Sequence, residues 1–411
     1  MKPLAEAQRE VLAAMRPLRE AEVHLAEALG LCLTEDVAAP HPVPPFANSS
    51  VDGFAVQAAG TGRPPVDLEV LEDVPAGHWP TLAVGPGTAV RIMTGAPLPA
   101  GADAVVMVER TTTVGAGRVR VAAAVAPGEG VRAAGSDLPA GARVFAAGER
   151  LTPAHLGVLA SIGVARPRVR RRPRVAVLST GDEVVSPDTP DPAPGTIRDA
   201  NRPLLAGLLA ELGAEVLDLG IVGDDAAQLA DALADAADAA DAVVTSGGVS
   251  VGDYDLVKQV LATLGGVQFW RVALQPGRPF AFGSLGGTPF FGLPGNPVSV
   301  MVAFEQLVRP ALLLCMGARA LFRPRVPGRL TAAVRTDPER TVFLRVAATY
   351  RAGWWEGAPS GGQGSHMLSA LARADAFAVV PAGVGDLAAG AEVELEMFRW
   401  PEARTIEQAL R

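Results

Sequence analysis

The sequence predicts a multidomain protein that combines one doubly wound α/β domain with β domains before and after it. Over residues 174–317, short apolar segments alternate with helix-like segments. Residues 46–136 and the stretch after residue 322 instead carry short Val-rich segments separated by Gly and Pro turns. The first pattern is typical of a parallel sheet covered by helices, and the second of sandwiches and barrels. A length of 411 residues leaves room for roughly two to four domains.

The N-terminal segment is expected to be helical, because apolar residues recur at helical spacing between Leu4 and Leu18. A shorter helix is expected over residues 22–29, ending at Gly30. The run Pro40–Pro45 offers few backbone donors and indicates a domain boundary.

The next segment is expected to contain strands and no helix, with strands at residues 66–71, 89–93, 104–108 and 118–121. A strand at residues 143–145 and a helix over Thr152–Ile162 follow. Thr152 can cap this helix, Pro153 suits its first position, and Gly163 suits its end.

The α/β domain is expected to alternate strands and helices in a parallel sheet. The expected strands are 175–178, 215–220, 242–245, 268–272, 280–282 and 289–291, and the expected helices are 201–212, 224–239, 255–264 and 297–316. The C-terminal β domain is expected to be barrel-like, with strands at 329–334, 343–349, 377–380 and 392–397.

Composition excludes several classes of protein. The formal charge of −8 argues against duplex nucleic acid as a ligand, which requires a basic surface. Cys32 and Cys315 lie far apart, so neither a disulfide framework nor a thiolate zinc site is expected. Residues 1–15 lack the apolar core of a signal peptide, and no apolar run reaches about 18 residues. We therefore expect a cytoplasmic protein that binds neither nucleic acid nor a membrane.

The basic run Arg166–Arg174 allows two interpretations. It could contact a phosphate or a nucleic acid, or it could be a solvated linker before the α/β domain. The acidic composition of the whole chain favours the linker.

Three glycine-rich turns follow predicted strands of the α/β domain. The carboxyl ends of parallel strands share one edge of a sheet, where such proteins bind their ligands. Glycine lets the backbone approach a ligand closely and direct N–H groups at an anion. One such turn would indicate only local geometry, whereas three together predict a phosphate pocket. The residues expected to line it are Ser179, Thr180, Gly181, Asp182, Ser246, Gly247, Gly248, Ser250, Gly252, Pro294, Gly295, Asn296, Pro297 and Ser299.

Acidic residues accumulate at the same edge, and carboxylates beside a phosphate normally require a cation such as Mg²⁺. Each acid also has a structural interpretation. Glu183 follows Thr180 at the spacing of a capping box, and Asp224 and Asp255 could each cap a helix. Taken together, the acids favour a metal ion; they are Asp182, Glu183, Asp224, Asp225, Asp253 and Asp255.

Six longer motifs occur along the chain: Asn48–Ala55, Arg91–Glu109, Leu178–Glu183, Ser246–Gly252, Pro276–Gly283 and Gly292–Ser299. In content and in order they resemble the molybdopterin molybdenumtransferase family, which includes the bacterial MoeA proteins and the related domain of gephyrin. The resemblance runs from the N-terminal helices to the C-terminal β domain.

The resemblance implies four domains and an elongated homodimer. The active cleft is expected between the α/β domain of one subunit and the inserted and C-terminal domains of the other. The implied divisions are an elongated domain from residues 1–44 and 140–172, an inserted β domain at 45–139, an α/β domain at 173–319 that resembles molybdopterin adenylyltransferase, and a β domain at 320–411.

The implied reaction takes adenylylated molybdopterin and molybdate as substrates. Molybdenum enters the dithiolene, the adenylate is cleaved, and AMP leaves, with Mg²⁺ as the implied cofactor. Molybdopterin adenylyltransferase and other cofactor-synthesis proteins are the implied protein partners.

The resemblance also assigns roles to single residues. Asp52, Thr94 and Asp137 match functional positions of the inserted domain. Glu183, Asp224 and Asp255 match the acids of the α/β domain and are the expected metal ligands. Pro294 and Pro297 shape the loop before the last helix of that domain. Substrate-binding positions are also matched by Arg345 and Ser365 and by the stretch that carries Arg271, Gln275 and Arg278.

One departure concerns this last stretch, which is usually Lys-rich in the family. Arg271 keeps a positive charge here and Gln275 has none, and the planar fork of Arg prefers bidentate anions. The choice between molybdate and tungstate therefore stays open. Two other functions are weighed: adenylyl transfer from ATP to molybdopterin, and a non-catalytic scaffold like gephyrin, which the retained acids disfavour.

Overall fold

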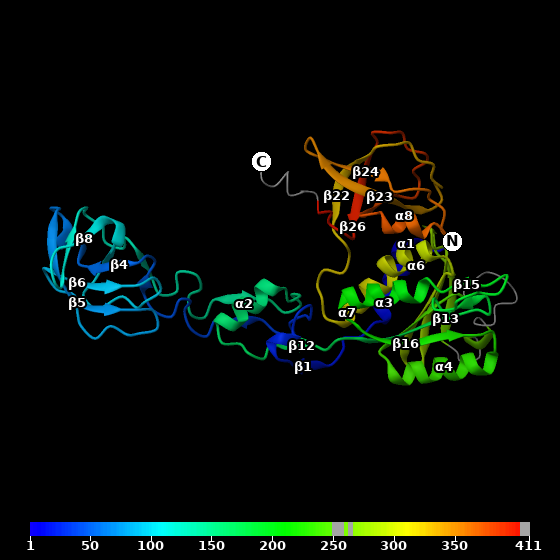
Figure 1. Cartoon of the computed structure of the whole chain (residues 1–411). Helices are drawn as coiled ribbons and strands as arrows, with labels where there is room; N and C mark the ends of the chain where they lie inside the picture. The colour runs from blue at the N-terminus through cyan, green and yellow to red at the C-terminus, as the bar shows by residue number, and fades with distance from the viewer. Residues whose placement is uncertain (249–258, 262–265, 403–411) are drawn as a thin grey trace. The chain divides into compact units, whose positions relative to one another are not determined.

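The computed structural model describes residues 1–248, 259–261 and 266–402. The chain forms two compact units, which are described separately (Figure 1). The first unit contains Met1–Ala21, Gly30–Thr34 and Arg168–Arg411, and the second contains Glu22–Leu29 and Glu35–Pro167. Most of the helix expected over residues 255–264 lies outside the described residues.

A six-stranded sheet forms the centre of the first unit. In sheet order its strands are β16 (Glu215–Val222), β13 (Arg174–Thr180), β17 (Ala242–Ser246), β21 (Thr288–Leu293), β20 (Pro279–Leu285) and β18 (Val267–Arg271). The first four strands run parallel, as predicted. The prediction of a parallel sheet is wrong for β20, which is antiparallel to both of its neighbours, whereas β18 runs in the same direction as the first four strands. The reason is a two-residue turn between β20 and β21 at Gly286 and Gly287, whose φ angles are both positive, as tight hairpins require.

Helices cover both faces of this sheet, with α3 (Asn201–Leu212) on one face and α4 (Ala226–Ala239) on the other (Figure 1). Leu229, Leu233 and Ala236 of α4 pack on the apolar residues of the central strands. Asp225 caps α4 by accepting from the backbone N–H of Gln228 at 2.9 Å. The capping interpretation of Asp224 was therefore wrong by one residue.

The helix predicted over residues 297–316 consists of α6 (Pro297–Ala303), a π-helical turn η4 (Phe304–Val308) and α7 (Arg309–Cys315). Pro310 has no N–H to donate to the carbonyl of Gln306, which instead accepts from the side-chain amide of Gln8 at 3.2 Å. By length and composition, Pro297–Cys315 could cross a membrane, but 89% of it is buried within the protein, as expected of a core helix.

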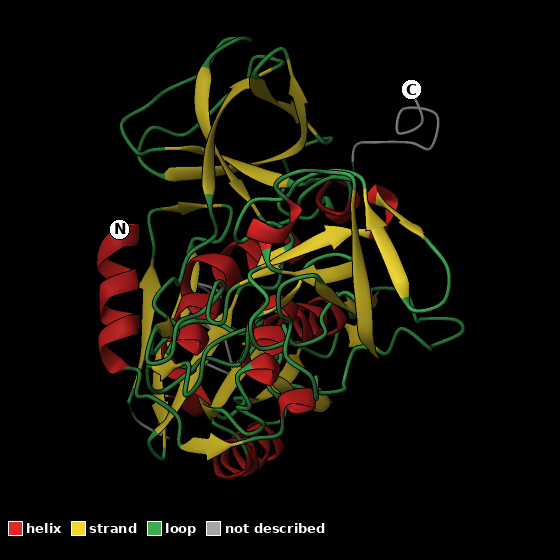
Figure 2. Cartoon of the chain, turned by 90° about the vertical axis from the view of Figure 1, so that its left-hand side faces the viewer, coloured by secondary structure: helices red, strands yellow, loops and turns green. Residues whose placement is uncertain are grey.

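Near the N-terminus, α1 (Leu4–Ala14) runs along the β18 edge of the sheet (Figure 2). The basic run joins this region to the sheet through specific contacts. Arg171 forms a bidentate ion pair with Asp241, and Arg174 forms an ion pair with Glu215 at 2.9 Å. These are the contacts of a structural connection, which agrees with the linker interpretation. Two short pairings complete this part of the chain: β1 (Glu20–Glu22) pairs with β12 (Arg168–Arg170), and β14 (Val184–Val185), beyond the carboxyl end of β13, pairs with β15 (Ile197–Arg198).

The C-terminal part of the first unit is a closed five-stranded barrel. It closes because β23 pairs with both β24 and β25. Two sequence predictions fail here: the strand expected at 329–334 begins four residues earlier, and β24 was not expected at all. The elements are β22 (Arg325–Leu330), β23 (Thr341–Arg351), β24 (Trp354–Pro359), α8 (Leu368–Ala372), β25 (Ala376–Val380) and β26 (Glu392–Met397), with β19 (Leu274–Gln275) added alongside β23.

The second unit is built on a six-stranded sheet. Residues 46–136 are all described and contain no α-helix, as predicted; their only helical elements are short 3₁₀ turns. The helix expected over residues 22–29 is wrong, since only the 3₁₀ turn η1 (Leu25–Glu27) forms there. Helix α2 (Pro153–Ser161) begins at a capping box between Thr152 and His155. The sheet order is β7 (Ala104–Met107), β4 (Gly53–Val56), β6 (Thr88–Ile92), β5 (Val66–Val74), β9 (Arg118–Val121) and β8 (Thr111–Thr113). The remaining elements are β2 (Val37–Ala38) paired with β11 (Arg143–Phe145), β3 (Asn48–Ser49) paired with β10 (Val131–Arg132), and the turns η2 (Ala58–Thr61) and η3 (Val108–Arg110).

A buried ion pair connects the π-helical turn to the segment before the barrel and gives the first testable prediction. Arg323 donates twice to Glu305, each time at 3.0 Å, and once to Glu211 at 3.1 Å. The side chain of Glu305 is 0% exposed and that of Glu211 is 59% exposed. We expect Glu305→Ala to lower the free energy of unfolding by about 3–5 kcal/mol, because a buried cation loses its partner. Glu211→Ala should cost less than about 1 kcal/mol in the same urea denaturation experiment. Equal losses of unfolding free energy in the two variants would show that the burial of Glu305 does not strengthen its ion pair with Arg323.

Candidate functional site

The three glycine-rich turns meet at one edge of the sheet. Strand register pairs Ser179 of β13 with Ser246 of β17, and Ser246 with Leu293 of β21. The residues that follow these positions therefore leave neighbouring parallel strands at the same level. This is the arrangement that the sequence predicted for a ligand-binding edge.

A cavity of about 260 Å³ lies at this edge. Eight predicted residues line it: Ser179, Thr180, Glu183, Ser246, Gly247, Gly295, Asn296 and Pro297. Four further lining residues with polar side chains were not singled out from the sequence: Arg198, Asp199, Asn201 and His366. Asn201 carried one usable signal, since it stands at the predicted start of a helix next to the expected pocket edge.

Buried polar atoms without partners lie around this cavity. Ser179 Oγ, Thr180 Oγ1 and Asn201 Oδ1 are buried and have no hydrogen-bond partner among the residues that the structure describes. Ser179 and Thr180 are only 2% and 4% exposed. Buried polar atoms are almost always paired in native proteins, so unpaired hydroxyls beside a cavity indicate a polar ligand.

Two glycines in these turns cannot be replaced without rearrangement. Gly247 has φ +91°, and a Cβ there would lie 2.8 Å from the carbonyl oxygen of Thr180. Gly181 has φ +127°, and a Cβ there would lie 2.5 Å from a carboxylate oxygen of Glu183. Both conformations lie in the region that L side chains rarely adopt. The backbone is therefore folded tightly beside the cavity, with the Glu183 carboxylate lying over Gly181.

The acids at this edge have different surroundings. Asp182 Oδ1 accepts from the backbone N–H of Asp224 at 2.8 Å and so ties the turn after β13 to the turn after β16. Glu183 follows a strand rather than opening a helix, so its capping-box interpretation is wrong. Asp255, together with Ser250, Gly252 and Asp253, lies outside the described residues. Within the described residues, no group of three or more His, Cys, Asp or Glu side chains could hold a metal ion.

The stretch with Arg271, Gln275 and Arg278 lies at the same edge, because β18 ends and β20 begins there. Arg271 and Arg278 are exposed. Gln275 Oε1 is buried and has no partner among the described residues, and a Cβ on the nearby Gly277 would lie 3.3 Å from the carbonyl oxygen of Ser299. The uncharged Gln275 thus sits close to α6 rather than in solvent.

Arg345 belongs to β23 of the barrel and is not among the residues that line the cavity. Its side chain is 0% exposed, and burial lowers its pKa to about 10. It donates to the carbonyls of Gly362 and Gly364, whereas its Nε and Nη1 have no partner in the described part of the chain. Ser365 accepts from the backbone N–H of Val298 at 3.2 Å through its carbonyl, so the barrel contacts the first turn of α6.

In the second unit the structure brings Asp52 and Thr94 together. Asp52 Oδ1 accepts from the backbone N–H of Thr94 at 2.7 Å and from its hydroxyl at 2.8 Å. These two bonds, aided by the charge of Arg91, lower the pKa of the Asp52 carboxyl. Asp137 lies in the segment where Leu138 bridges Val43, and its N–H donates to the Val43 carbonyl at 3.0 Å.

We expect Thr94→Val to raise the pKa of Asp52 towards the ordinary value of an aspartate, because the hydroxyl bond is lost while the backbone bond remains. The lowered pKa stabilises the folded form above the unfolded pKa, and this contribution disappears as the pH falls through the folded pKa. Carboxyl-detected NMR titration measures the shift directly. An unchanged pKa in Thr94→Val would mean that the backbone N–H alone sets it.

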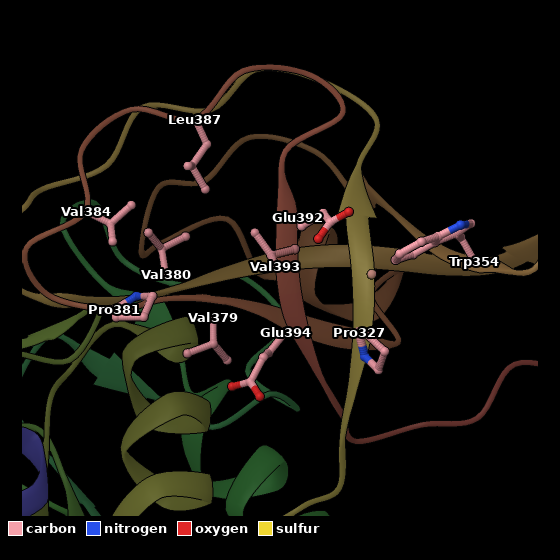
Figure 3. A pocket seen from close by; sticks show the side chains of 11 residues that line it. Pro327, Trp354, Val379, Val380, Pro381, Val384, Leu387, Glu392, Val393 and Glu394 are labelled. Atoms are coloured by element: carbon pink, nitrogen blue, oxygen red, sulfur yellow. The ribbon is translucent and has the colours of Figure 1, made fainter.

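A second cavity, of about 430 Å³, lies in the barrel (Figure 3). Apolar side chains line most of it, including Val380, Val384 and Leu387, and the carboxylates of Glu392 and Glu394 lie at its edge. Of the predicted site residues that the structure describes, none lines it. The three unpartnered buried polar atoms described above instead lie at the sheet edge, so that cavity is the better candidate for a phosphorylated ligand.

Comparison with known families assigns the three parts of the chain. Residues 2–163 match the MoeA N-terminal region (domain I and II), residues 176–313 match a probable molybdopterin binding domain, and residues 327–398 match the MoeA C-terminal region (domain IV). The sheet-edge cavity thus lies mainly in the part that matches a molybdopterin binding domain.

Similar proteins extend the match to nearly the whole chain. Molybdopterin molybdenumtransferase 2 of Mycobacterium tuberculosis is 41% identical over 96% of this chain and 99% of that protein. Molybdopterin molybdenumtransferase of Haemophilus influenzae is 38% identical over 93% of this chain and 95% of that protein. A crystal structure of the molybdopterin biosynthesis MoeA protein from Pyrococcus horikoshii aligns with a TM-score of 0.82 at 28% identity, over 97% of this chain and 100% of that one.

Fold and site together define a transferase of molybdenum cofactor biosynthesis built around a molybdopterin-binding α/β domain. The chain belongs to the molybdopterin molybdenumtransferase (MoeA) family.

Proposed function

We propose that this chain inserts molybdenum from molybdate into adenylylated molybdopterin and releases AMP. The observation that carries the proposal is the sheet-edge cavity with unpartnered Ser179 and Thr180 hydroxyls, in a chain of this family. The unpartnered hydroxyls suit the oxygens of a phosphate group. Molybdate needs no soft protein ligand in this scheme, because the dithiolene sulfurs of the substrate receive the metal.

Mg²⁺ is proposed as the cofactor. The donor chemistry fits, since the Glu183 carboxylate lines the cavity beside hydroxyl oxygens, and Mg²⁺ prefers oxygen ligands. Glu183, Asp224 and Asp255 are the proposed ligands. When bound, Mg²⁺ would neutralise charge on the substrate phosphates as a Lewis acid. The protein's own part is to hold the phosphates with the turns after β13, β17 and β21 and to keep their backbone in place through Gly181 and Gly247.

The other predicted residues keep their proposed roles. Asp52, Thr94 and Asp137 are proposed as catalytic residues of the inserted domain, and the lowered pKa of Asp52 keeps its carboxylate ionised as an acceptor at neutral pH. The remaining proposed substrate-binding residues are Asp182, Ser246, Gly248, Ser250, Gly252, Arg271, Gln275, Arg278, Pro294, Gly295, Asn296, Pro297, Ser299 and Ser365. Arg345, whose side chain is 0% exposed, is proposed to support substrate binding through the barrel loop to which it donates hydrogen bonds.

The proposal includes the four domains at the divisions given above, a cytoplasmic homodimer with a shared cleft, and contact with the adenylyltransferase that supplies the substrate. Sedimentation of the purified protein measures the oligomeric state, and a monomer at micromolar concentration would contradict the dimer.

The test of function uses two reaction mixtures. We expect AMP and pterin-bound molybdenum from adenylylated molybdopterin with molybdate and Mg²⁺. We expect no pyrophosphate from ATP with molybdopterin. Pyrophosphate release in the second mixture would instead favour an adenylyltransferase. Ligand binding without turnover in both mixtures would favour a scaffold. If the first mixture turned over only when tungstate replaced molybdate, the transferred metal would be tungsten.

A further inference from the structure

The loop between β24 and α8 reaches from the barrel to the sheet-edge cavity. His366, near the end of this loop, lines that cavity together with residues of β13, β17 and α6. The carbonyl of Ser365 accepts from the N–H of Val298, which fixes the loop to the first turn of α6. A side chain from the barrel is thereby placed at a cavity formed mainly by the α/β domain.

Arg345 holds this loop from below. Its Nη2 donates to the carbonyl of Gly362 at 2.8 Å and to that of Gly364 at 3.1 Å. The Gln363 amide adds bonds in both directions, accepting from the Arg345 N–H at 2.9 Å and donating to the Arg345 carbonyl at 3.1 Å. Because the Arg345 side chain is 0% exposed, it cannot touch a ligand in the cavity in this conformation.

The charged groups that line the cavity either already have protein partners or are negatively charged and would repel an anionic ligand. Asp199 accepts from the Arg202 side chain at 3.0 Å, and Arg198 donates to the carbonyls of Thr189 and Pro190. Glu183 is an anion. His366 lines the same cavity as the Ser179 and Thr180 hydroxyls and is exposed, so its ring can offer an N–H to a phosphate oxygen there.

We propose that His366 contacts the substrate by donating a hydrogen bond to a phosphate oxygen, and that Arg345 is a positioning residue acting through the loop that carries His366. This rests on the proposed function, which supplies a phosphorylated ligand. Two phosphates share this chemistry, that of the adenylate and that of the pterin, and the experiment separates them.

The loop offers a way to displace the ring without removing it. Gly364 has an ordinary φ, and a Cβ there would lie 2.8 Å from Cε1 of His366. Gly364→Ala should therefore push the flexible ring aside at little cost to stability. His366→Ala removes the ring, and His366→Asn keeps an N–H donor. His78→Ala is the control, since His78 is an exposed histidine of the second unit.

The full-length wild type and variants are titrated calorimetrically with AMP and, separately, with molybdopterin. We expect His366→Ala and Gly364→Ala to weaken binding of at least one ligand about tenfold, the usual effect of losing a hydrogen bond to a charged group. His366→Asn should recover part of this loss, and His78→Ala should match the wild type. In turnover assays KM should rise while kcat changes little.

A change for AMP alone assigns His366 to the adenylate phosphate, and a change for molybdopterin alone assigns it to the pterin phosphate. Arg345→Met should weaken the same ligand and also lower the unfolding temperature. Wild-type affinity for both ligands in His366→Ala would overturn the proposal and leave the proposed function intact. A wild type that binds neither ligand would overturn both.

Discussion

Gly247→Ala is expected to reduce AMP release from adenylylated molybdopterin by roughly a hundredfold or more. The left-handed φ of +91° costs an L residue about 1–2 kcal/mol, and the added Cβ would also lie 2.8 Å from the Thr180 carbonyl oxygen. That oxygen belongs to backbone, so the turn itself must move. A displacement of about 1 Å at a substrate-positioning group is sufficient for a hundredfold loss.

A matched control separates backbone strain from the collision. Gly287 in the β20–β21 turn has a similar φ of +97°, and a Cβ there would meet nothing within 4 Å. Gly287→Ala should lower stability by about 1–2 kcal/mol and leave ligand affinity unchanged. If Gly247→Ala behaved in the same way as Gly287→Ala, the turn after β17 would not be part of the binding site.

Glu183→Gln is expected to abolish the Mg²⁺ dependence of ligand binding and to reduce turnover about a hundredfold or more. The substitution keeps the size of the side chain and removes the charge that attracts the metal, whose contribution to phosphate chemistry is several kcal/mol. Calorimetric titration with AMP, with and without Mg²⁺, measures the effect directly. In the wild type Mg²⁺ should strengthen binding; in the variant it should not.

Glu215→Gln is the corresponding control. Glu215 is an exposed carboxylate at the start of β16. It lies at the amino ends of the strands, away from the cavity, where it pairs with Arg174. It should keep the wild-type response to Mg²⁺. A Glu183→Gln protein that still responded to Mg²⁺ as the wild type does would remove Glu183 from the metal site.

The sequence predicted those elements best whose signals are local. Helix α3 begins and ends as expected, at Asn201 and Leu212, because Gly213 adopts the left-handed φ of +92° that terminates a helix. The strands before the glycine-rich turns were equally clear, since β13 and β17 are buried runs of β-branched residues. Because these strands were identified, the sheet edge at their carboxyl ends could be predicted as the place of the ligand cavity.

What could not be predicted depends on contacts between distant parts of the chain. His366 comes from the barrel, and only the tertiary structure brings it to the same cavity as Ser179. Arg345 matched a substrate-binding position in sequence, but its complete burial under the loop is a property of the tertiary structure. The π-helical turn likewise arises where Pro310 cannot donate and Gln8, some 300 residues away in sequence, bonds to the Gln306 carbonyl instead.

The central claim, transfer of molybdenum with loss of the adenylate, is tested most directly by a molybdate titration. Purified protein, Mg²⁺ and a fixed amount of adenylylated molybdopterin are mixed with increasing molybdate, and AMP released and molybdenum bound to the pterin are measured in the same samples. We predict that both rise together, with one molybdenum bound for each AMP, and that Asp255→Ala responds far less. AMP release that is independent of molybdate, or ligand binding with no AMP at any molybdate concentration, would contradict the account.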